Sequence, residues 1–301
     1  MDDVLSDIFK RIQLESCVYF KKDFAAPWAM EMDVSGMAQF HLVTRGHCVL
    51  QDRHRQYHGA AGDIFLLPRG GWHYLGDRPN QKAVPGSDLM ASLQTDQPLF
   101  SDGDVEAQLI CGHYDYREDL LHPLITQLPA IIHLKSRELP ELDALNSFIS
   151  LLMAEMSEYA PGGTAVIEKL AEVLLVKILR SFLLTTKQPT GFLSALKDPR
   201  LSKAVDAIHK NHGEDLSLED LANAAGMSRS SFAAHFKDMT GLTPAVYLTH
   251  WRMFLACEML RAGDKSSGQI ADQIGYESEV SFSRAFRRYL NVTPAVYRRQ
   301  A

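Results

Sequence analysis

The sequence lacks the features of membrane-spanning and disulfide-rich chains. Nowhere in its 301 residues do 18 apolar residues follow one another, so we expect no membrane span. Its four cysteines, Cys17, Cys48, Cys111 and Cys257, show no paired spacing and are expected to be reduced. The acidic start, Met1-Asp2-Asp3, precedes no apolar core or small-residue cleavage site of a secretory signal. Together these absences predict a cytoplasmic protein.

Acidic residues are in modest excess over basic residues, but the charges are unevenly distributed along the chain. The net charge is −6, and ordinary composition with this length predicts two domains. Residues 1–196 hold 17 basic against 25 acidic residues, whereas residues 197–301 hold 14 against 12. From Val280 onward there are five arginines and no acidic residue. The two parts of the chain therefore have different electrostatic surroundings.

Residues 1–135 have the pattern of short strands. Apolar segments such as 40–43, 64–67 and 108–111 are separated by turns rich in glycine and proline. Regular turns between short apolar segments predict a β-barrel or sandwich.

Residues 136–184 change to a helical period. Apolar residues recur at three- and four-residue spacing from Leu142 to Met156 and again from Val166 to Phe182, on either side of Pro161-Gly162-Gly163. This predicts a helical hairpin whose wide apolar face packs on the barrel, forms a dimer interface, or both. The polar residues 185–197, with Pro189 and Gly191, are the predicted linker.

Residues 198–301 contain an internal repeat. The segment Thr243-Pro244-Ala245-Val246-Tyr247 recurs 50 residues later as Thr293-Pro294-Ala295-Val296-Tyr297. Each copy predicts a helix-turn-helix unit, with Ser217, Ser228 and Ser278 as helix N-caps and Gly226 in the first turn. A long helix from about Tyr247 to Leu260 joins the two units.

The second helix of each unit has an outward face. If the phenylalanine pairs Phe232/Phe236 and Phe282/Phe286 are buried, the remaining side chains point outward, where such helices meet the major groove. These candidate DNA-binding residues are Arg229, Ser230, Ala233, Ala234 and Lys237 in the first unit, and Glu279, Val280, Ser283, Arg284, Arg287 and Arg288 in the second.

Residues 198–301 resemble the AraC/XylS-type DNA-binding domain along their whole length. The resemblance is carried by Leu221-Ala222, Gly226-Met227-Ser228, Phe232, Phe236, Gly241, Thr243-Pro244, Trp251-Arg252-Met253, Ile270-Ala271, Gly275-Tyr276-Glu277-Ser278, Phe282-Ser283-Arg284-Ala285-Phe286 and Tyr297-Arg298. It implies seven helices, two reading heads in successive major grooves, and control of transcription.

The resemblance also places the base-reading residues. They fall on Ser230, Ala233 and Ala234 in the first head, and on Glu279, Val280, Ser283 and Arg284 in the second. Because alanine cannot read guanine, we expect the second head to carry most specificity, with Arg284 on a guanine. The expected phosphate contacts are Lys237, Arg252, Arg287, Arg288, Arg298 and Arg299.

Residues 1–135 resemble the cupin-type sensor domain of one branch of that family. Gly62-Asp63, Pro68, Gly70 and His73 match the second cupin motif. The first motif is poor, because the His-x-His pair with a following glutamate is absent. Metal-dependent cupin catalysis needs those ligands, so we expect no enzyme. The alternatives are a metal-dependent cupin enzyme with a fused helical domain and a purely structural dimerisation module.

Three kinds of signal fit the sensor domain. His41, His73 and His113 converging in the barrel would bind a transition metal. Among Cys17, Cys48 and Cys111, a pair with low pKa would respond to oxidants. A small organic ligand would sit in a barrel mouth lined by aromatic residues. The aromatic candidates are Trp28, Phe40, Phe65, Trp72 and Tyr74.

The sequence thus predicts an α+β multidomain protein. Its parts are a cupin-like β-barrel sensor (1–135), a helical hairpin for dimerisation (136–184), a linker (185–197) and an all-α tandem helix-turn-helix domain (198–301). We expect a homodimeric regulator that binds double-stranded DNA, does not bind a membrane, and activates transcription through RNA polymerase in response to an unknown effector.

Overall fold

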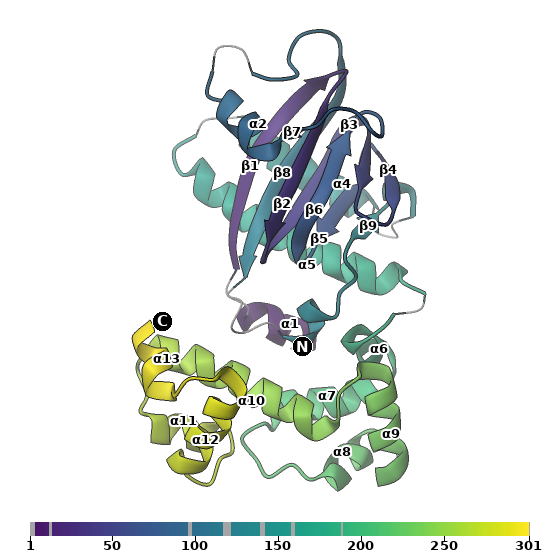
Figure 1. Ribbon diagram of the computed structural model, residues 1–301. Coiled ribbons are helices and arrows are strands. Elements are labelled where there is room, and N and C mark those ends of the chain that lie inside the picture. Colours follow the sequence, from purple (N-terminus) through teal and green to yellow (C-terminus); the bar gives the residue numbers. More distant parts are fainter. Residues whose placement is uncertain are drawn as a thin grey trace. The chain divides into compact units, whose positions relative to one another are not determined.

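The computed structural model divides the chain into two compact units (Figure 1). It describes residues 4–11, 14–95, 98–116, 122–138, 142–157, 160–187 and 189–300. The sheet unit comprises Leu14–Tyr116 and Pro129–Thr186. The helical unit comprises Met1–Gln13, Arg117–Leu128 and Lys187–Ala301.

The sheet unit is built on a curled sheet with the strand order β1-β8-β3-β6-β2-β7. Strands β4 and β5 also pair with β3, and β9 pairs with β5; only the β2–β7 pairing is parallel among the described ladders. The strands are β1 (Leu14–Ala25), β2 (Ala29–Ser35), β3 (Met37–Gln51), β4 (Gln56–Ala60), β5 (Ile64–Leu67), β6 (Gly70–Gly76), β7 (Val84–Pro85), β8 (Val105–Tyr116) and β9 (Ile132–Leu134). The expected cupin-like β domain is confirmed.

Strand β3 connects the two halves of the curled sheet. Its first part pairs with β5 and β8, and its last part pairs with β4 and β6. The strand bends between them, where the register with β8 shifts after Val43. Gly46 lies at this bend with φ +75°, and a Cβ there would stand 1.8 Å from the carbonyl oxygen of Glu106. Only glycine therefore fits this position without moving β8.

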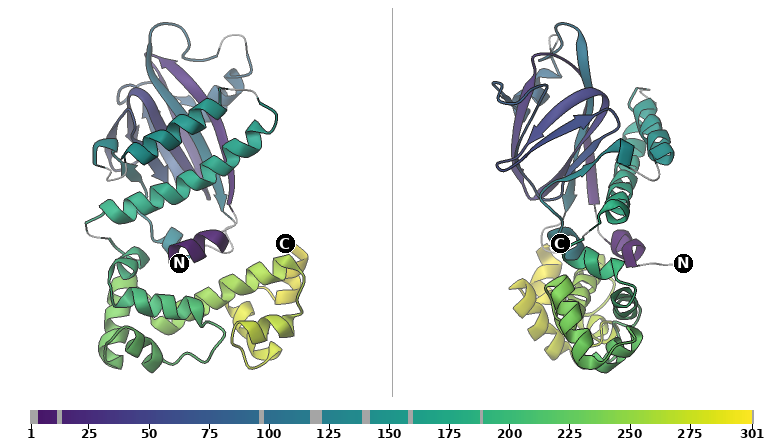
Figure 2. Two further views of the ribbon diagram at one scale, coloured as in Figure 1. Left: turned by 180° about the vertical axis from the view of Figure 1, so that it is seen from behind. Right: turned by 90° about the vertical axis from the view of Figure 1, so that its right-hand side faces the viewer.

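The predicted helical hairpin lies against one face of the sheet. It consists of α4 (Leu142–Glu155) and α5 (Gly163–Thr185), which cross the back of the strands in Figure 2. The hydroxyl of Tyr114 donates to the carbonyl of Ala171 at 2.8 Å, and that of Ser16 donates to Glu168 O at 2.7 Å. Packing on the sheet, one of the two roles expected for the hairpin, is therefore confirmed. On the opposite side, the short helix α2 (Gly86–Ser92) contacts β2 and β7.

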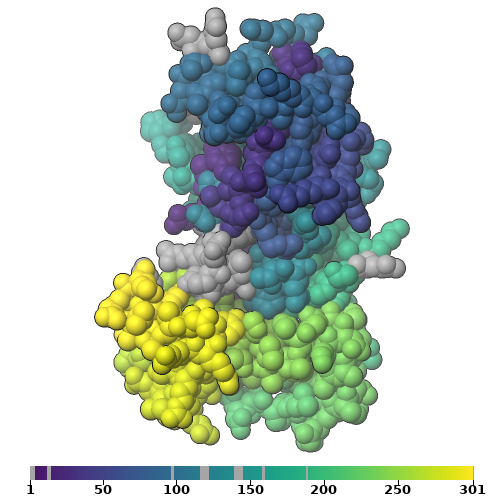
Figure 3. All heavy atoms as spheres, in the orientation of Figure 1, coloured from purple at the N-terminus to yellow at the C-terminus, as the bar shows by residue number. Residues whose placement is uncertain are grey.

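The helical unit contains the repeat predicted from the sequence. Residues 198–301 form seven helices in their described part: α7 (Leu201–Lys210), α8 (Leu218–Ala224), α9 (Arg229–Thr240), α10 (Pro244–Ala262), α11 (Ser267–Gln273), α12 (Glu279–Leu290) and α13 (Pro294–Gln300). Helix α10 runs between the two repeats, which occupy opposite ends of the unit (Figures 1 and 3).

The predicted helix starts are confirmed by their caps. Ser217 and Asp220 form a reciprocal capping box at α8, while Ser228 and Ser278 accept from backbone N–H groups in the first turns of α9 and α12. Gly226 has φ +65°, as its turn requires. These local bonds define where each recognition helix begins.

The compact units differ from the expected domain boundaries in two places. Helix α1 (Val4–Arg11) and the segment around α3 (Pro123–Thr126) belong to the helical unit, although both lie within residues 1–135. Part of the expected linker forms α6 (Phe192–Lys197), and Phe192 is fully buried. The apolar pair Phe192-Leu193 therefore packs into the helical unit. Residues 192–197 are thus a folded helix of that unit and not a polar linker.

Among the described helices, none has the length and apolar character needed to cross a membrane.

Candidate nucleic-acid interface and sensor cavity

The recognition helices α9 and α12 present the same arrangement. Phe232 and Phe236 in α9 are completely buried, as are Phe282 and Phe286 in α12. The opposite face of each helix is directed to solvent and carries polar, basic and a few small apolar side chains. Of the predicted contacts, Arg229, Ser230, Ala234, Lys237, Glu279, Val280, Arg284, Arg287 and Arg288 are exposed, and Ala233 and Ser283 are half-buried.

The two outward faces differ in chemistry. Helix α9 offers Ala233 and Ala234, whose methyl groups can contact thymine but carry no hydrogen-bonding atom. Helix α12 offers the guanidinium of Arg284, which can make two bonds to guanine. Val280, with 59% of its surface exposed, is an apolar side chain left in water beside it.

Two of the expected phosphate contacts instead hold the helical unit together. Arg252 is half-buried and donates to the backbone carbonyls of His212 and Glu214, both at 2.8 Å. Arg298 is half-buried and donates to the carbonyl of Lys265. The sequence pattern did not separate these arginines from the exposed ones, because their acceptors lie on loops about 33 to 40 residues away.

A buried hydrogen-bond chain connects α1 and the α3 segment to the DNA-binding helices. The backbone N–H of Leu124 donates to Nδ1 of His122 at 3.0 Å, which leaves the proton of His122 on Nε2. His122 Nε2 then donates to the hydroxyl of Tyr247 at 3.1 Å. Tyr247 donates to Nε2 of His209 at 2.7 Å, and His209 Nδ1 donates to the Asp7 carboxylate at 2.9 Å.

Each group in this chain has one consistent role. Both histidines are neutral, and burial lowers the pKa of His122 and of His209. For Asp7, burial opposes ionisation, but bonds from His209 and Arg11 prevail and lower the pKa to about 2. The network therefore combines two neutral imidazoles, a neutral phenol and one carboxylate, and every proton has an acceptor.

Further contacts hold the same two segments. Arg11 bonds both Asp7 and Glu258 of α10 at 2.9 Å. The side chain of Gln127 bonds the N–H of Phe192 and the carbonyl of Thr240 at the end of α9. The contacts of α1 and the α3 segment were not predicted from the sequence. Their only local signals are the Asp7/Arg11 spacing and His122 directly before Pro123, and both patterns are also common on surfaces.

Two of the three predicted metal-binding histidines meet inside the sheet unit. His41 Nε2 lies 3.0 Å from His73 Nε2, and His41 Nδ1 lies 3.1 Å from the sulfur of Cys111. His73 Nδ1 donates to the carbonyl of Gly71 at 2.9 Å. The order Cys111 S–H to His41 to His73 to Gly71 satisfies each group in its neutral form. Burial lowers the pKa of both imidazoles, in agreement with that order.

His113 lies elsewhere. Its ring stacks on that of Tyr19 with the ring centroids 4.9 Å apart. His113 and Cys17 line a cavity of about 380 Å³. The strand register explains this, because Cys111 is opposite His41 and His113 is opposite Gln39. Within the described residues, no group of three or more His, Cys, Asp or Glu side chains is arranged to hold a metal ion. The expected convergence of His41, His73 and His113 is therefore not found.

The cysteines do not have the depressed pKa of a redox pair. No disulfide joins any of the four cysteines, all of which lie in the described residues. Burial raises the pKa of Cys48 to about 12 and that of Cys111 well above its usual range. Cys17 is exposed, yet partial burial, assisted by the charge of Glu168, also raises its pKa. Cys17, Cys48 and Cys111 are thus protonated at neutral pH and weakly nucleophilic.

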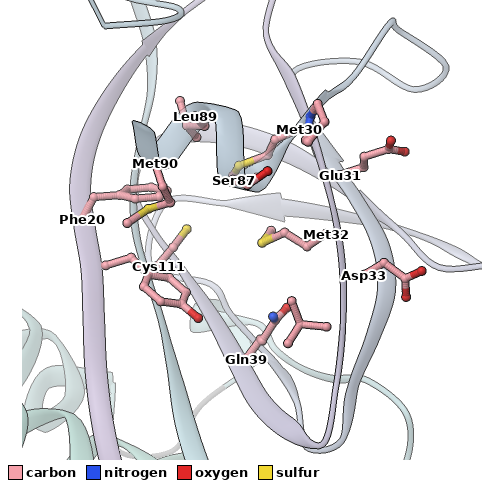
Figure 4. A pocket seen from close by; sticks show the side chains of 14 residues that line it. Phe20, Met30, Glu31, Met32, Asp33, Gln39, Ser87, Leu89, Met90 and Cys111 are labelled. Atoms are coloured by element: carbon pink, nitrogen blue, oxygen red, sulfur yellow. The ribbon is translucent and has the colours of Figure 1, made fainter. Parts of the chain in front are cut away.

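A cavity of about 360 Å³ lies in the sheet unit (Figure 4). It is lined by β1, β2, β3 and β8 on one side and by α2 on the other. The aromatic residues expected at the barrel mouth do not line this cavity. Phe40 contacts Tyr114, and Phe65 stacks on His133, because their positions in β3 and β5 direct them into other parts of the core. Most of the lining residues are apolar, and three of them are methionines.

Comparison with known proteins agrees with these features. A cupin family model matches residues 3–183, and a helix-turn-helix domain model matches residues 221–300. A putative AraC-like transcription regulator of Streptomyces lividans is 30% identical over 99% of this chain and 98% of its own length. An uncharacterized HTH-type transcriptional regulator of Haemophilus influenzae is 29% identical over the same shares.

A third relative is the RCS-specific HTH-type transcriptional activator RclR of Escherichia coli, which is 28% identical over 84% of this chain and 90% of its own length. All three relatives are named as transcriptional regulators, and they span both units of the chain. The chain therefore belongs to the AraC-like family of transcriptional regulators, with an N-terminal cupin domain and a C-terminal helix-turn-helix domain, and is a DNA-binding regulator rather than an enzyme.

Proposed function

We propose that this regulator recognises a specific duplex sequence by placing α9 and α12 in successive major grooves. The observation that carries the proposal is the repeated arrangement of the two helices: each begins at a serine cap, buries a phenylalanine pair and exposes its opposite face. Both are attached to α10, which sets their separation. Two such helices about one turn of DNA apart form a bipartite reading surface.

Base discrimination rests mainly on the second helix. Arg284 is the candidate for a bidentate guanine contact, worth about 1–3 kcal/mol against a wrong base. Lys237, Arg287 and Arg288 are exposed and are assigned to phosphates. Phosphate contacts add affinity for any duplex and make binding fall with salt.

A fluorescence-anisotropy titration tests this assignment. The full chain is titrated with its own upstream DNA and with a scrambled duplex, at several salt concentrations. We expect Arg284→Ala to weaken binding to the cognate duplex about 5- to 150-fold and to change scrambled binding little. The matched control, Arg287→Ala, weakens both duplexes alike and lowers the salt slope by about one. Equal loss on both duplexes for Arg284→Ala rejects its reading role.

The α4/α5 hairpin is the proposed dimer interface. Its outer surface exposes Leu151, Val166, Val173 and Leu184, with exposed fractions of 53%, 44%, 45% and 55%. Apolar side chains grouped on one hairpin favour a second copy as the partner. Sedimentation velocity of the Leu151→Asp/Val173→Asp variant should show a lighter species. The control Leu99→Asp, at an exposed leucine outside the hairpin, should leave the sedimentation coefficient unchanged, and equal behaviour of both variants excludes this interface.

The regulator is proposed to activate transcription under control of the sheet unit. The E. coli relative is named an activator, which supports this direction. Strand β1 follows residues 1–13 of the helical unit, strand β8 precedes residues 117–128, and Leu14 pairs with Tyr116. A change in these paired strands therefore acts directly on the two chain segments bound to α10. In vitro transcription with RNA polymerase, comparing the wild type with a variant unable to bind DNA, tests activation; a fall in transcript on adding the regulator contradicts it.

A further inference from the structure

We propose that the 360 Å³ cavity binds a small, uncharged aromatic alcohol whose hydroxyl bonds the side-chain amide of Gln39. The proposal names the chemical class of the signal, and so rests on the regulatory role above. It combines three observations on the described residues: the size and apolar lining of the cavity, an amide oxygen without a partner, and the charges around the cavity.

The cavity has the dimensions of a small-ligand site. Its volume of about 360 Å³ would hold about a dozen waters at about 30 Å³ each, near the lower end for ligand pockets. A bicyclic aromatic molecule is of this size, whereas a long acyl chain or a sugar polymer is not.

The lining favours an aromatic ring. Met30, Met32 and Met90 line the cavity together with Phe20 and Cys111. Figure 4 shows the sulfur atoms of the methionines and of Cys111 directed toward the interior of the cavity. Thioether sulfur makes favourable contacts with aromatic rings, and the unbranched methionine side chain adapts to the shape of a ligand. The residues Leu89 and Val34 complete an apolar wall.

Gln39 supplies the proposed polar contact, and of the other polar side chains lining the cavity, Ser87 already donates to Asp88. The residue is only 1% exposed, and its Oε1 is buried without a hydrogen-bond partner in the described structure. Its amide lies at one end of the cavity (Figure 4). A buried amide oxygen without a donor is costly, and a hydroxyl entering the cavity would satisfy it.

The charges around the cavity select an uncharged ligand. The residues that line the cavity include Glu31 and Asp33 but no lysine or arginine. The two carboxylates point away from the interior in Figure 4. They therefore give a cation no direct partner inside and repel an anion from outside. A carboxylate ligand would lose its hydration without gaining a counter-charge.

The same residues connect the cavity to the rest of the chain. Phe20 belongs to β1 and Cys111 to β8, and the two positions are paired in the ladder. These are the strands that join the segments Met1–Gln13 and Arg117–Leu128 of the helical unit. A ligand that fixes the spacing of Phe20 and Cys111 thus acts on the strands through which the sheet unit is proposed to control DNA binding.

Isothermal titration of the full chain, without DNA, tests the proposal with three probes that share one ring system. These are 2-naphthol, naphthalene and 2-naphthoate. We expect 2-naphthol to bind about two- to tenfold more tightly than naphthalene, the range for one hydrogen bond, and 2-naphthoate to bind at least about tenfold more weakly than 2-naphthol. Absence of 2-naphthol binding, or tighter binding of 2-naphthoate, overturns the proposal.

Variants locate the contact. Gln39→Leu replaces the amide with an apolar side chain of similar size, and should bind naphthalene and 2-naphthol equally. The matched control Gln94→Leu, at an exposed glutamine, should keep the wild-type ratio. Met32→Trp fills the cavity and should abolish binding of both. If Gln39→Leu keeps the preference for 2-naphthol, the hydroxyl is bound elsewhere and the assignment is wrong.

The DNA titration is a separate measurement, so the two proposals fail independently. Loss of specific DNA binding in the wild type rejects the regulatory function while leaving probe binding intact. Loss of probe binding with normal DNA recognition rejects only the ligand class. Adding saturating 2-naphthol to the DNA titration should shift the Kd for the cognate duplex at least about threefold, and the Met32→Trp variant should show no shift.

Discussion

Replacing Tyr247 by phenylalanine removes one hydroxyl from the centre of the buried network in the helical unit. Tyr247 is fully buried, and its oxygen bonds His122 at 3.1 Å and His209 at 2.7 Å. Phenylalanine keeps the ring contacts with Phe192 and Phe236. The substitution therefore isolates the two hydrogen bonds from the packing.

The magnitude follows from what is left behind. In Tyr247→Phe, His122 retains a buried N–H donor and His209 a buried ring nitrogen, each without its partner. One unsatisfied buried polar group costs about 1–3 kcal/mol, so the pair should cost about 2–6 kcal/mol of the free energy that holds α1 and the α3 segment in place. Opening of these segments should then become about 30-fold or more easier.

Hydrogen exchange followed by mass spectrometry measures that opening directly. Peptides covering residues 4–11 and 122–128 should exchange at least about 30-fold faster in Tyr247→Phe, while peptides from β3 and β8 should not change. The control Tyr276→Phe removes a hydroxyl from a half-buried ring and retains its contact with Arg252. If both variants exchange alike, or if Tyr247→Phe changes the rates less than threefold, the reasoning about this network is refuted.

Three further predictions follow from other residues. Burial lowers the pKa of His122 and His209, so the unfolded chain binds more protons below pH 6.5; urea unfolding of the helical unit should show stability falling as pH drops from about 7 to 5, and a flat profile would contradict this. Gln39→Leu removes the orphaned amide and should stabilise the ligand-free protein by about 1–2 kcal/mol in chemical denaturation, whereas destabilisation would indicate a partner for that amide. Gly46→Ala should lower stability by more than about 2 kcal/mol, because its Cβ meets the Glu106 carbonyl; an unchanged denaturation midpoint would show that β8 moves without cost.

The helix-turn-helix repeat was predictable because its determinants are local. Serine caps, the turn glycine and phenylalanine pairs four residues apart act within one or two helical turns, and the structure confirms Ser217, Ser228 and Gly226 in these roles. The predicted DNA contacts on α9 and α12 are outward for the same reason, while their base and phosphate assignments stay predictions. Arg252 shows the limit of the pattern, since its acceptors come from a distant loop.

The sensor residues depended on strand register, which the sequence did not specify. The sequence predicted that His113 joins His41 and His73. In the structure the neighbour of His41 is Cys111, because strand pairing places Cys111 opposite His41, 70 positions away along the chain. The cavity could not be predicted from the sequence either, because α2 and the methionines of β2 meet only in the folded unit. The docking of α1 and α3 on α10 was missed for the same reason.

The helical unit draws its residues from three separate stretches of chain, and this has a consequence for the order of events during synthesis. Helix α1 leaves the ribosome more than 200 residues before α10 is complete, an interval of about 10–50 s at ordinary elongation rates. During that time Ile8 and Asp7 have no α7 or α10 to contact. The sheet unit, whose last residue is Thr186, is finished first. A nascent regulator therefore possesses its cavity before it possesses a complete DNA-binding surface, so an effector present in the cell can occupy the chain before it ever meets an operator.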